Sequence, residues 1–505
     1  MNKDGNLFEL LRHNFPADLG RPFITDGTRG TYSYAAMIDL SGRVANYLEN
    51  CGLKQGDRVA VQVQKSPEAL MIYLACIRAG LIYIPLNTAY QLPELQYFFD
   101  DSRPSLIIGD PKNAKVMQQL AETVGSQFTT MSADGRGSLM DSADLCSPDY
   151  NSTLCADSDL AAILYTSGTT GRPKGAMLSH KNLSSNALVL KQIWGWSDED
   201  VLLHALPIFH VHGLFVACHC VLAAGASMIF LPAFNAKDVI GNLSAATVMM
   251  GVPTFYTRLL AEQAFGASHC ENMRLFISGS APLLEDTHQQ FEQRTGHTIL
   301  ERYGMSETSM QTSNPLKGER RAGTVGFALP GIDVRIVDRN NHPVTGDNIG
   351  SIQVKGPNVF QGYWKMPEKT AEEFTPDGYF ITGDQGKISA DGYISIVGRA
   401  KDMVISGGYN VYPKEVELVI DSLKGIAECA VFGIADSDFG EAVVVAIVPD
   451  GDDGQVLDVE SIIDETKLQL ASYKVPKKVH FVEELPRNTM GKVQKNILRE
   501  QFAKP

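Results

Sequence analysis

The sequence predicts an α/β fold with a large N-terminal domain of βαβ layers, a small β-barrel-like unit, and a small mobile α+β C-terminal domain. Short apolar runs alternate with helical patterns over most of the chain, which is typical of parallel sheets covered by helices. At 505 residues the chain is also too long for a single hydrophobic core. At least two domains are therefore expected.

The expected strands of the first domain are short apolar runs bounded by turn residues. A polar segment at 132–159 interrupts them and is interpreted as a surface excursion. Strands interleaved with helical patterns in this way indicate parallel βαβ units. The predicted strands lie within 58–64, 81–87, 105–110, 227–234, 247–253 and 274–283.

The texture of the sequence changes twice in its last third. From about residue 321 to 401, short strands are separated by Gly, Pro, Asn and Asp turns, which predicts a small antiparallel β unit. Beyond it, the strand patterns AECAVFGI and AVVVAIVPD and the helical pattern DVESIIDETKLQLA indicate a compact α+β domain. We predict domains at 1–401 and 402–505, with a hinge at Lys401–Asp402.

Composition excludes several classes of function. The net charge of −14 argues against a nucleic-acid partner, although local cations could still bind small anions. The eight cysteines lack zinc-site spacing and are interpreted as reduced thiols of a cytoplasmic protein. Residues 201–236 contain no Asp, Glu, Lys or Arg, but histidines and prolines interrupt them. We expect strand, loop, buried helix and strand there, with no membrane partner.

One loop has the composition of a phosphate-binding site. The stretch ILYTSGTTGRPKGAMLSH, residues 163–180, places glycines, hydroxyls and Lys174 after an apolar strand. It lacks the Walker pattern, because Pro173 and Gly175 stand where a glycine and a Ser or Thr are required. Backbone amides and hydroxyls of such a turn can still hold phosphate oxygens. The alternative is a flexible glycine-rich turn.

Five motifs occur in a recognisable order: YTSGTTGRPKGA, ERYGMSET, YFITGDQGKI, VGRAKDMVISGGYNVYPKEVE and LPRNTMGKVQKN. Through them the chain resembles acyl-CoA synthetases of the adenylate-forming superfamily over essentially its whole length. The resemblance implies that a carboxylate reacts with ATP, releases pyrophosphate, and passes as an acyl-adenylate to the thiol of coenzyme A. The phosphate-binding loop would then hold the β- and γ-phosphates as a leaving group.

The resemblance also assigns roles around the nucleotide. Glu307 is the expected Mg²⁺ ligand, and Ser306 stands where relatives usually have Thr and would contact the α-phosphate. Asp384 and Arg399 are expected at the ribose, since a carboxylate accepts from both hydroxyls. The other residues expected to bind ATP or AMP are Thr166, Ser167, Gly168, Thr169, Thr170, Gly171, Lys174, Ser280, Ala281, Pro282, Glu301, Arg302, Tyr303, Gly304 and Met305.

The C-terminal domain is expected to serve both half-reactions by rotating about Asp402. Lys492 matches the catalytic lysine that bridges the attacking carboxylate and the α-phosphate, where it offsets developing charge. Lys495 is the nearest rival and is expected to face solvent. The residues expected to contact coenzyme A are Gly407, Gly408, Tyr409 and Lys474.

Two arginines suggest the class of acid. Arg258 lies within an apolar helix pattern, Arg302 directly precedes YGM, and His210 and His212 are close by. Buried arginines require an anion, and the reacting carboxylate must stay free to attack phosphorus. Arg258, Arg302, His210 and Ser280 are therefore expected to bind a small dicarboxylate, malonate or perhaps methylmalonate, with His210 also serving catalysis. The motifs are closely similar to those of family members that activate malonate.

Other interpretations of the same residues stay open. Arg258 could be a helix-end residue that reaches solvent, Arg302 could pair with Glu301, and His210 could be a core histidine. The protein would then be a ligase for a short, medium-chain or aromatic monocarboxylate. A catalytically silent nucleotide- or acyl-binding protein on the same fold is a third possibility. The sequence does not predict an oligomeric state.

Overall fold

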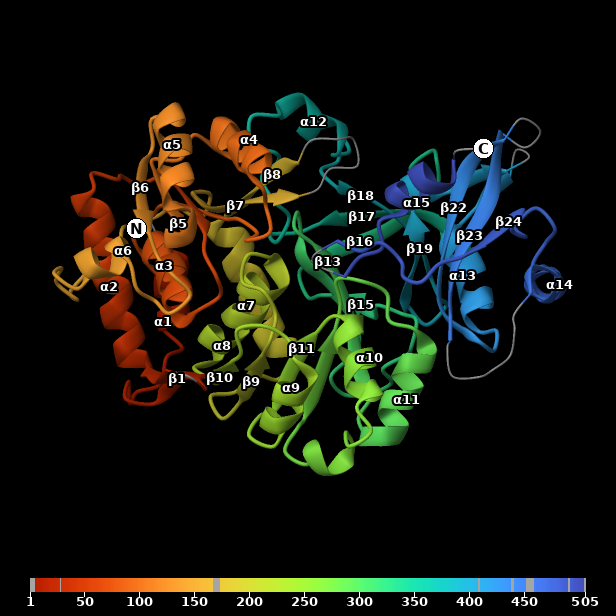
Figure 1. Ribbon diagram of the computed structural model, residues 1–505, viewed down its shortest axis with the longest axis horizontal. Helices are drawn as coiled ribbons and strands as arrows, with labels where there is room; N and C mark the ends of the chain where they lie inside the picture. Colours follow the sequence, from red (N-terminus) through yellow and green to blue (C-terminus); the bar gives the residue numbers. More distant parts are fainter. Residues whose placement is uncertain are drawn as a thin grey trace. The chain divides into compact units, whose positions relative to one another are not determined.

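The computed structural model describes residues 5–27, 29–166, 173–406, 409–436, 440–450, 458–488 and 491–503. Contacts between Cα atoms divide the chain into two compact units (Figure 1). The first comprises Met1–Asp333 with Lys355–Gly378, and the second comprises Val334–Val354 with Tyr379–Pro505. Of the predicted antiparallel β unit, residues 334–354 and 379–401 thus group with the C-terminal residues, whereas 321–333 and 355–378 belong to the first unit. The domain boundary and hinge at Lys401–Asp402 stay predictions.

A long, mostly parallel sheet forms the base of the first unit. Its order is β15-β14-β13-β12-β11-β9-β10-β1-β2, and the six strands from β13 to β1 run parallel. The carboxyl ends of these strands therefore meet at one edge, where ligands bind in open α/β sheets. The strands are β1 (Pro22–Asp26), β2 (Gly30–Ser33), β9 (Val201–His204), β10 (Ser227–Phe230), β11 (Val248–Gly251), β12 (Leu275–Ser278), β13 (Ile299–Met305), β14 (Ser309–Ser313) and β15 (Phe327–Ala328).

A second sheet of the same unit has the order β6-β5-β3-β4-β7-β8. It is parallel from β6 to β7, whereas β8 returns antiparallel to β7. The predicted βαβ architecture is confirmed by both sheets. The strands are β3 (Arg58–Gln62), β4 (Ile82–Pro85), β5 (Leu106–Gly109), β6 (Gln127–Thr130), β7 (Leu160–Thr166) and β8 (Lys174–Ser179).

Helices cover these sheets, and their starts follow the sequence. Ser66 and Ser179 cap α3 and α7 by accepting from the backbone N–H of Ala69 and Asn182. The polar segment 132–159 is not wholly a surface excursion, because it contains the short helix α6 with buried apolar residues. The helices are α1 (Leu7–Arg12), α2 (Tyr34–Asn50), α3 (Pro67–Arg78), α4 (Leu92–Ser102), α5 (Ala114–Val124), α6 (Ser138–Ala143), α7 (His180–Ile193), α8 (His219–Ala224), α9 (Ala236–Leu243), α10 (Pro253–Ala261), α11 (Glu285–Thr295) and α12 (Pro367–Glu372), with short η1 (Pro111–Asn113), η2 (His212–Cys218) and η3 (Ala267–His269).

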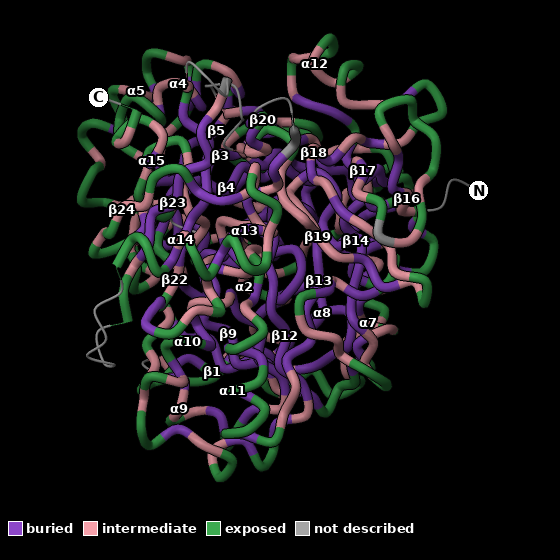
Figure 2. Tube along the Cα trace, turned by 90° about the vertical axis from the view of Figure 1, so that its right-hand side faces the viewer, coloured by how far each residue is buried: buried purple, intermediate pink, exposed green. Residues whose placement is uncertain are grey.

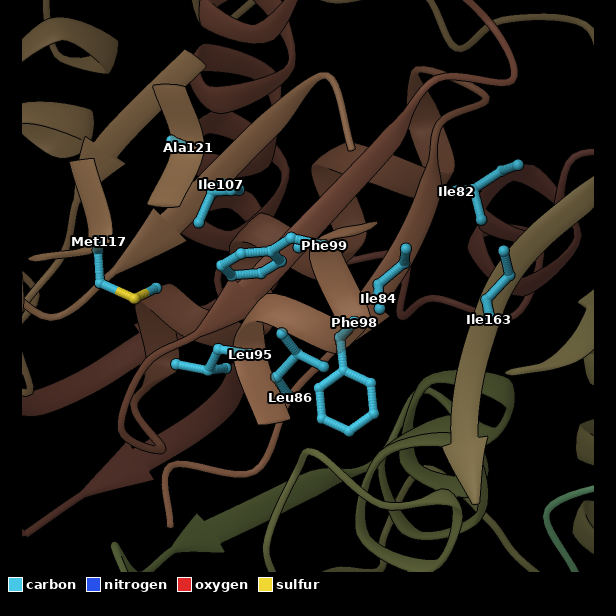
Figure 3. Close-up of a cluster of buried hydrophobic side chains, with 11 residues drawn as sticks. Ile82, Ile84, Leu86, Leu95, Phe98, Phe99, Ile107, Met117, Ala121 and Ile163 are labelled. Atoms are coloured by element: carbon cyan, nitrogen blue, oxygen red, sulfur yellow. The ribbon is translucent and has the colours of Figure 1, made fainter. Parts of the chain in front are cut away.

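An apolar cluster fixes the strand that leads into the predicted phosphate-binding loop. Figure 3 shows Ile163 of β7 beside the aliphatic side chains of β4, with the phenylalanines of α4 close by. Each buried aliphatic or aromatic side chain contributes about 1.5–3 kcal/mol of transfer free energy. The end of β7 is therefore rigidly placed. The cluster comprises Ala60, Ile82, Ile84, Leu86, Leu95, Phe98, Phe99, Ile107, Met117, Ala121 and Ile163.

The second unit contains two smaller sheets. The first has the order β16-β17-β18-β19, in which β17 and β19 each run antiparallel to β18, and the second has the order β21-β20-β23-β22 with β24 parallel to β23. Helices α13 and α15 pack on β22 (Figure 1). The elements are β16 (Asp333–Val337), β17 (Gly346–Lys355), β18 (Phe380–Ile388), β19 (Ile394–Arg399), η4 (Ala400–Asp402), β20 (Val404–Ser406), β21 (Tyr409–Val411), α13 (Pro413–Asp421), β22 (Ile426–Asp436), β23 (Gly440–Pro449), α14 (Val459–Gln469), β24 (Lys478–Phe481) and α15 (Lys495–Phe502).

Burial follows the sheets, as Figure 2 shows by the purple strands and the largely pink and green surface helices. Residues 201–236 form strand, loop, buried helix and strand, as predicted from their lack of charge. Within the described part of the chain, no helix has the length and apolar character needed to cross a membrane. All eight cysteines are free thiols, and six of them are buried.

An ion pair formed by a buried carboxylate ties the amino ends of three parallel strands together. The carboxylate of Asp200, directly before β9, accepts from Arg274 Nε at 2.6 Å and Nη2 at 2.7 Å, and from Thr247 Oγ1 at 2.8 Å. Thr247 directly precedes β11, and Arg274 directly precedes β12. Burial alone would raise the pKa of Asp200, but the hydrogen bonds from Arg274, the Ser197 N–H and Thr247 outweigh it and lower the pKa.

Replacing Asp200 by Asn should destabilise the first unit by about 3 kcal/mol at neutral pH, because it leaves Arg274 without its bidentate partner. The folded-state pKa of Asp200 is lowered, so the contribution is present above the unfolded-state value of about 3.9 and is lost as the pH falls through the folded-state value. Urea unfolding at pH 7 and at about pH 2.5, below the unfolded-state pKa of about 3.9, should show the difference in unfolding free energy between Asp200→Asn and wild type narrowing at the lower pH.

Asp198→Asn is the matched control. Asp198 pairs with Arg21 at 2.8 Å on the surface, where both side chains are substantially exposed to solvent. Its loss should change the unfolding free energy by less than about 1 kcal/mol. An equal loss of stability in both variants would contradict the role assigned to Asp200.

Candidate active site

The predicted phosphate-binding loop leaves β7 at Thr166 and enters β8 at Lys174. These two residues are paired in antiparallel register, so β7 and β8 form a β-hairpin. A strand, rather than the helix of a Walker loop, follows the lysine. Five loop residues predicted to bind phosphate lie outside the described residues: Ser167, Gly168, Thr169, Thr170 and Gly171.

Lys174 is buried and engaged with a carboxylate. Its Nζ donates to Glu373 Oε1 at 2.9 Å and lies 4.1 Å from the ring centre of Tyr363. Tyr363 forms an isolated antiparallel β-bridge with Ala176 of β8, and Glu373 directly follows α12. Neither Tyr363 nor Glu373 was predicted from the sequence, because they lie about 190 and 200 residues beyond the lysine in a segment without a motif.

Glu307, the predicted magnesium ligand, lies in the same network. Its Oε1 accepts from the Tyr363 hydroxyl at 3.0 Å and from Thr166 Oγ1 at 3.5 Å, and the residue is buried. Mg²⁺ in phosphate-transferring sites is commonly held by one or two carboxylates together with substrate phosphates. A buried carboxylate beside the end of the phosphate-binding loop fits that arrangement, so Glu307 is a suitable ligand for a nucleotide-bound Mg²⁺.

Arg302 lies in β13 and is almost completely buried. Its Nε and Nη2 have no hydrogen-bond partner among the residues that the structure describes. The guanidinium packs on Gly279, where a Cβ atom would lie 2.4 Å from Cζ, so the arginine fits only beside a glycine. Burial lowers the pKa of Arg302 to about 9, which still leaves it charged at neutral pH. A buried, unpaired cation of this kind requires an anionic ligand.

The pair with Glu301 that the sequence left open for Arg302 is not formed in the structure. Adjacent residues of a strand point to opposite faces. Glu301 Oε1 instead accepts from the backbone N–H of Gly323 at 3.2 Å and lies 4.0 Å from His288 Nδ1.

His212 lies close to Arg302 and was noted in the sequence only as a neighbour of His210. It is buried in η2, and its Nδ1 is 3.2 Å from Ser280 Oγ. Burial, followed by the charge of Arg302, lowers the pKa of His212 well below the usual value, so the imidazole is neutral. Ser280 adopts the left-handed φ of 74°, which is uncommon for a residue with a side chain and concentrates at functional sites.

His210 and Arg258 were both predicted to bind the acid. His210 is half-buried, and its Nδ1 accepts from the His212 N–H at 3.3 Å. Arg258 was expected to be buried, but it is exposed on α10. The apolar stripe of that helix, Phe255, Tyr256 and Leu259, faces the interior, and Arg258 lies outside it. Binding roles for both residues stay predictions.

The predicted adenine walls lie beyond β12 and along β13. Ala281 is half-buried and Pro282 exposed, directly after Ser280. Tyr303 is buried, whereas Gly304, Met305 and Ser306 at the strand end are half-buried. Their position at the carboxyl edge of the parallel sheet is where a nucleotide is expected, and their contacts to it stay predictions.

The predicted ribose-binding pair is preassembled within the second unit. Asp384 in β18 and Arg399 in β19 occupy paired positions, and Arg399 Nε lies 2.9 Å from Asp384 Oδ1. The backbone N–H of Asp384 donates to Thr382 Oγ1 at 3.1 Å. The arginine therefore orients the carboxylate, while the ribose contacts themselves stay predictions.

The predicted catalytic lysine is positioned by a compact turn. The N–H of Lys492 donates to Asn488 Oδ1 at 3.0 Å, and the carbonyl of Lys492 accepts from the Asn488 N–H at 2.9 Å. Lys495 does not face solvent as expected, because its Nζ donates to the buried Glu417 Oε1 at 2.5 Å. Asp402, the predicted pivot, lies in η4 and accepts from Arg499 at 2.8 Å.

The residues predicted to contact coenzyme A are only partly described. Gly407 and Gly408 lie outside the described residues, and Tyr409 is described only as the backbone start of β21. Lys474 donates to Glu415, a short contact between the residues after α14 and the first turn of α13. Their role in binding coenzyme A stays a prediction.

Curated relatives match nearly the whole chain. A malonate–CoA ligase of Arabidopsis thaliana is 35% identical, over 91% of this chain and 80% of the relative. The mitochondrial malonate–CoA ligase ACSF3 of Xenopus laevis is 36% identical, over 88% of this chain and 83% of the relative. A feruloyl-CoA synthase of Amycolatopsis sp is 35% identical, over 93% of this chain and 94% of the relative.

The fold agrees with these matches. The crystal structure of ATP-bound MatB from Rhodopseudomonas palustris is 52% identical, with a TM-score of 0.97 and 99% of both chains covered. The family model for AMP-binding enzymes matches residues 12–364, and the model for the C-terminal domain of AMP-binding enzymes matches residues 415–492. The chain therefore belongs to the AMP-binding enzyme family.

Proposed function

We propose that this protein is an AMP-forming malonate–CoA ligase, which joins malonate to coenzyme A through a malonyl-adenylate and releases AMP and pyrophosphate. Family membership supplies the two-step chemistry. Relatives named as malonate–CoA ligases, and the 52% identity to MatB, support the acid. The observation that carries the substrate class is the buried cation of Arg302 without a partner among the described residues.

The geometry suggests how the acid is held. One carboxylate of malonate must stay free to attack the α-phosphorus of ATP. The other would take the partnerless Nε and Nη2 of Arg302 in a bidentate, charge-assisted pair. Ser280 and His212 lie beside this position and add hydroxyl and imidazole groups to the pocket. Methylmalonate adds only a methyl group and is the expected secondary substrate.

Lys174 and Glu307 are proposed to act at the phosphates. Lys174 would contact the β- and γ-phosphates, which leave together as pyrophosphate. Glu307 would hold Mg²⁺, which on binding neutralises charge on the phosphate oxygens. Thr166 at the end of β7 would donate to the same oxygens, because its hydroxyl lies at the entrance of the loop.

The second unit is proposed to contribute three groups. Asp384, oriented by Arg399, would accept from the ribose hydroxyls. Lys492 would bridge the attacking carboxylate and the α-phosphate, where its charge offsets the charge that builds on pentavalent phosphorus. Rotation about Asp402 would then allow the thioester step, with the loop around Gly407 and Gly408 beside the pantetheine arm.

A ligase for monocarboxylates is the second candidate, because a feruloyl-CoA synthase is among the relatives at 35% identity. An apolar or aromatic acid would leave the buried charge of Arg302 uncompensated, which costs several kcal/mol. The arginine therefore favours a dicarboxylate. A cytoplasmic location is proposed as well, since six buried free thiols suit a reducing compartment that supplies ATP and coenzyme A.

Replacing Arg302 by Met should reduce kcat/KM for malonate on the order of 10³-fold, because the distal carboxylate would meet an apolar wall. The flexible Met side chain should fill the space without unfolding the protein. Activity with butyrate should fall much less, since a monocarboxylate places only methylene and methyl groups there. Pyrophosphate release and thioester formation are measured with a panel of acids at saturating ATP and coenzyme A. They give kcat/KM for malonate and for butyrate in the variant and in wild type.

Arg258→Ala gives the contrasting arm, because Arg258 was also predicted from the sequence to bind the dicarboxylate but is exposed in the structure. A loss for malonate comparable to that of Arg302→Met would place both arginines on the substrate. Unchanged malonate preference in Arg302→Met would exclude the proposed binding of the distal carboxylate, while leaving the ligase chemistry intact.

Lys492→Ala should slow the adenylation step on the order of 10²-fold or more while sparing the second step. Malonate-dependent exchange of pyrophosphate into ATP measures the first step. Conversion of chemically prepared malonyl-adenylate to malonyl-CoA measures the second. Lys467→Ala, at an exposed position of α14 where the lysine pairs with neighbouring Asp464 at 2.9 Å, removes the same charge and should leave both rates unchanged. Loss of both steps in Lys492→Ala would argue for a structural role.

A further inference from the structure

We propose that Glu373 is the resting counter-ion of Lys174, which a phosphate of the nucleotide displaces on binding. The inference rests on the proposed contact between Lys174 and the β- and γ-phosphates, and it adds a positioning residue to that contact. Glu373 itself touches no reacting atom. Its carboxylate holds the lysine side chain in place until the nucleotide supplies a stronger anion.

The contact between the two residues is close and shielded. Lys174 Nζ donates to Glu373 Oε1 at 2.9 Å, and the two side chains are 9% and 21% exposed. An ion pair this far from solvent is stronger than a surface pair, and removing one member leaves a partly buried charge. Lys174 therefore needs a partner anion in the resting enzyme, and Glu373 is that partner.

A shared phenol joins Glu373 to the predicted magnesium ligand. The Tyr363 hydroxyl lies 2.7 Å from Glu373 Oε2 and 3.0 Å from Glu307 Oε1, and burial together with these carboxylates raises its pKa far above the usual value. Tyr363 thus stays protonated, and its single hydrogen can serve only one carboxylate at a time. Burial alone would raise the pKa of Glu373, but Tyr363 and Lys174 outweigh it and lower the pKa, so the carboxylate is ionised.

Arrival of a polyphosphate changes the balance of charge at Lys174. A terminal phosphate carries more negative charge than a carboxylate and therefore competes for the lysine. Two carboxylates, those of Glu307 and Glu373, already share one phenol, so a further anion at this position disfavours Glu373. Glu307 would be neutralised by the Mg²⁺ that accompanies the nucleotide, whereas Glu373 would not.

The structure also provides a place for the displaced carboxylate. Lys369, one helical turn earlier on α12, has its Nζ 3.3 Å from the same Glu373 Oε1. Lys369 is more exposed than Lys174, so a Glu373 that leaves Lys174 keeps an ionic partner closer to solvent. Exchange between two lysines costs less than creating an unpaired carboxylate. Glu373 can therefore release Lys174 without unfolding any element.

Glu373→Gln tests the displacement directly, because Gln keeps the shape and removes the charge. The full-length variant should bind β,γ-methylene-ATP roughly five-fold more tightly than wild type, since no ion pair has to be broken. Its affinity for AMP should be unchanged, because AMP lacks the phosphates that Lys174 contacts. Isothermal titration calorimetry with both nucleotides in the presence of Mg²⁺ measures the two affinities.

Glu372→Gln is the matched control. It makes the same charge change one residue earlier, at a side chain that is 66% exposed and pairs with Lys369 at 2.9 Å. Affinity for both nucleotides should stay within about two-fold of wild type, as expected for a surface pair. Equal tightening in Glu372→Gln would show a general effect of net charge and would overturn the proposal.

Lys174→Gln separates this inference from the proposed function. It should lose affinity for β,γ-methylene-ATP but not for AMP, and Glu373→Gln should then add nothing in the double variant. If Lys174→Gln leaves the affinity for the analogue unchanged, the phosphate contact itself is wrong, and the inference falls with it. If Lys174→Gln weakens binding while Glu373→Gln fails to tighten it, the phosphate contact stands and only the displacement is overturned.

Discussion

Arg302 places a positive charge among strands and neutral side chains of the first unit. A positive charge in such surroundings has to be compensated by a negative charge. In a medium of low dielectric constant, an uncompensated guanidinium costs several kcal/mol. Among the groups that act on its pKa, Tyr256 and Cys220 are buried and keep their protons. Nε and Nη2 of Arg302 have no hydrogen-bond partner among the described residues, which supports the proposed binding of an anionic ligand there.

Lys174 and Arg302 are both buried cations, yet among the described residues of their unit only Lys174 is paired with a carboxylate. The difference follows from the ligand each is proposed to bind. Exchanging a protein carboxylate for a substrate carboxylate yields little free energy, so an arginine that recognises a dicarboxylate must be left without a counter-ion. A polyphosphate with Mg²⁺ carries more charge than the carboxylate it displaces. The lysine can therefore rest on Glu373 and still bind.

Much of this organisation follows from local sequence patterns. The apolar runs at 58–64 and 105–110 became parallel strands, because alternation of strand and helix patterns is enforced by burial on both faces of a sheet. The prediction that Arg258 is buried was wrong and could have been avoided. The helical period through Phe255 and Leu259 already places Arg258 outside the apolar face of the helix. The helix α6 was not predicted because it is too short to show a helical pattern of apolar residues.

Other features depend on distance in the chain and could not be predicted from one sequence. Glu373 and Tyr363 reach Lys174 only because α12 and the segment before it fold back beside β8. No spacing or motif marks that return. His210 and His212 are two residues apart in a charge-free stretch, and η2 follows neither the helical nor the strand period. Only the fold shows that His212 is the histidine beside Ser280.

The position of Ser280 has a consequence for the proton on His212. A left-handed φ at a residue with a side chain costs about 1 kcal/mol, and the structure keeps it where Ser280 Oγ meets His212 Nδ1. If Nδ1 accepts from the serine, the single proton of the neutral imidazole lies on Nε2. That atom is buried and has no partner among the described residues, like Nε and Nη2 of Arg302. The serine thus makes Nε2 of a buried histidine a donor, in addition to the two donors of Arg302. Buried donors of this kind need acceptor oxygens, which an apolar side chain of an acid does not supply.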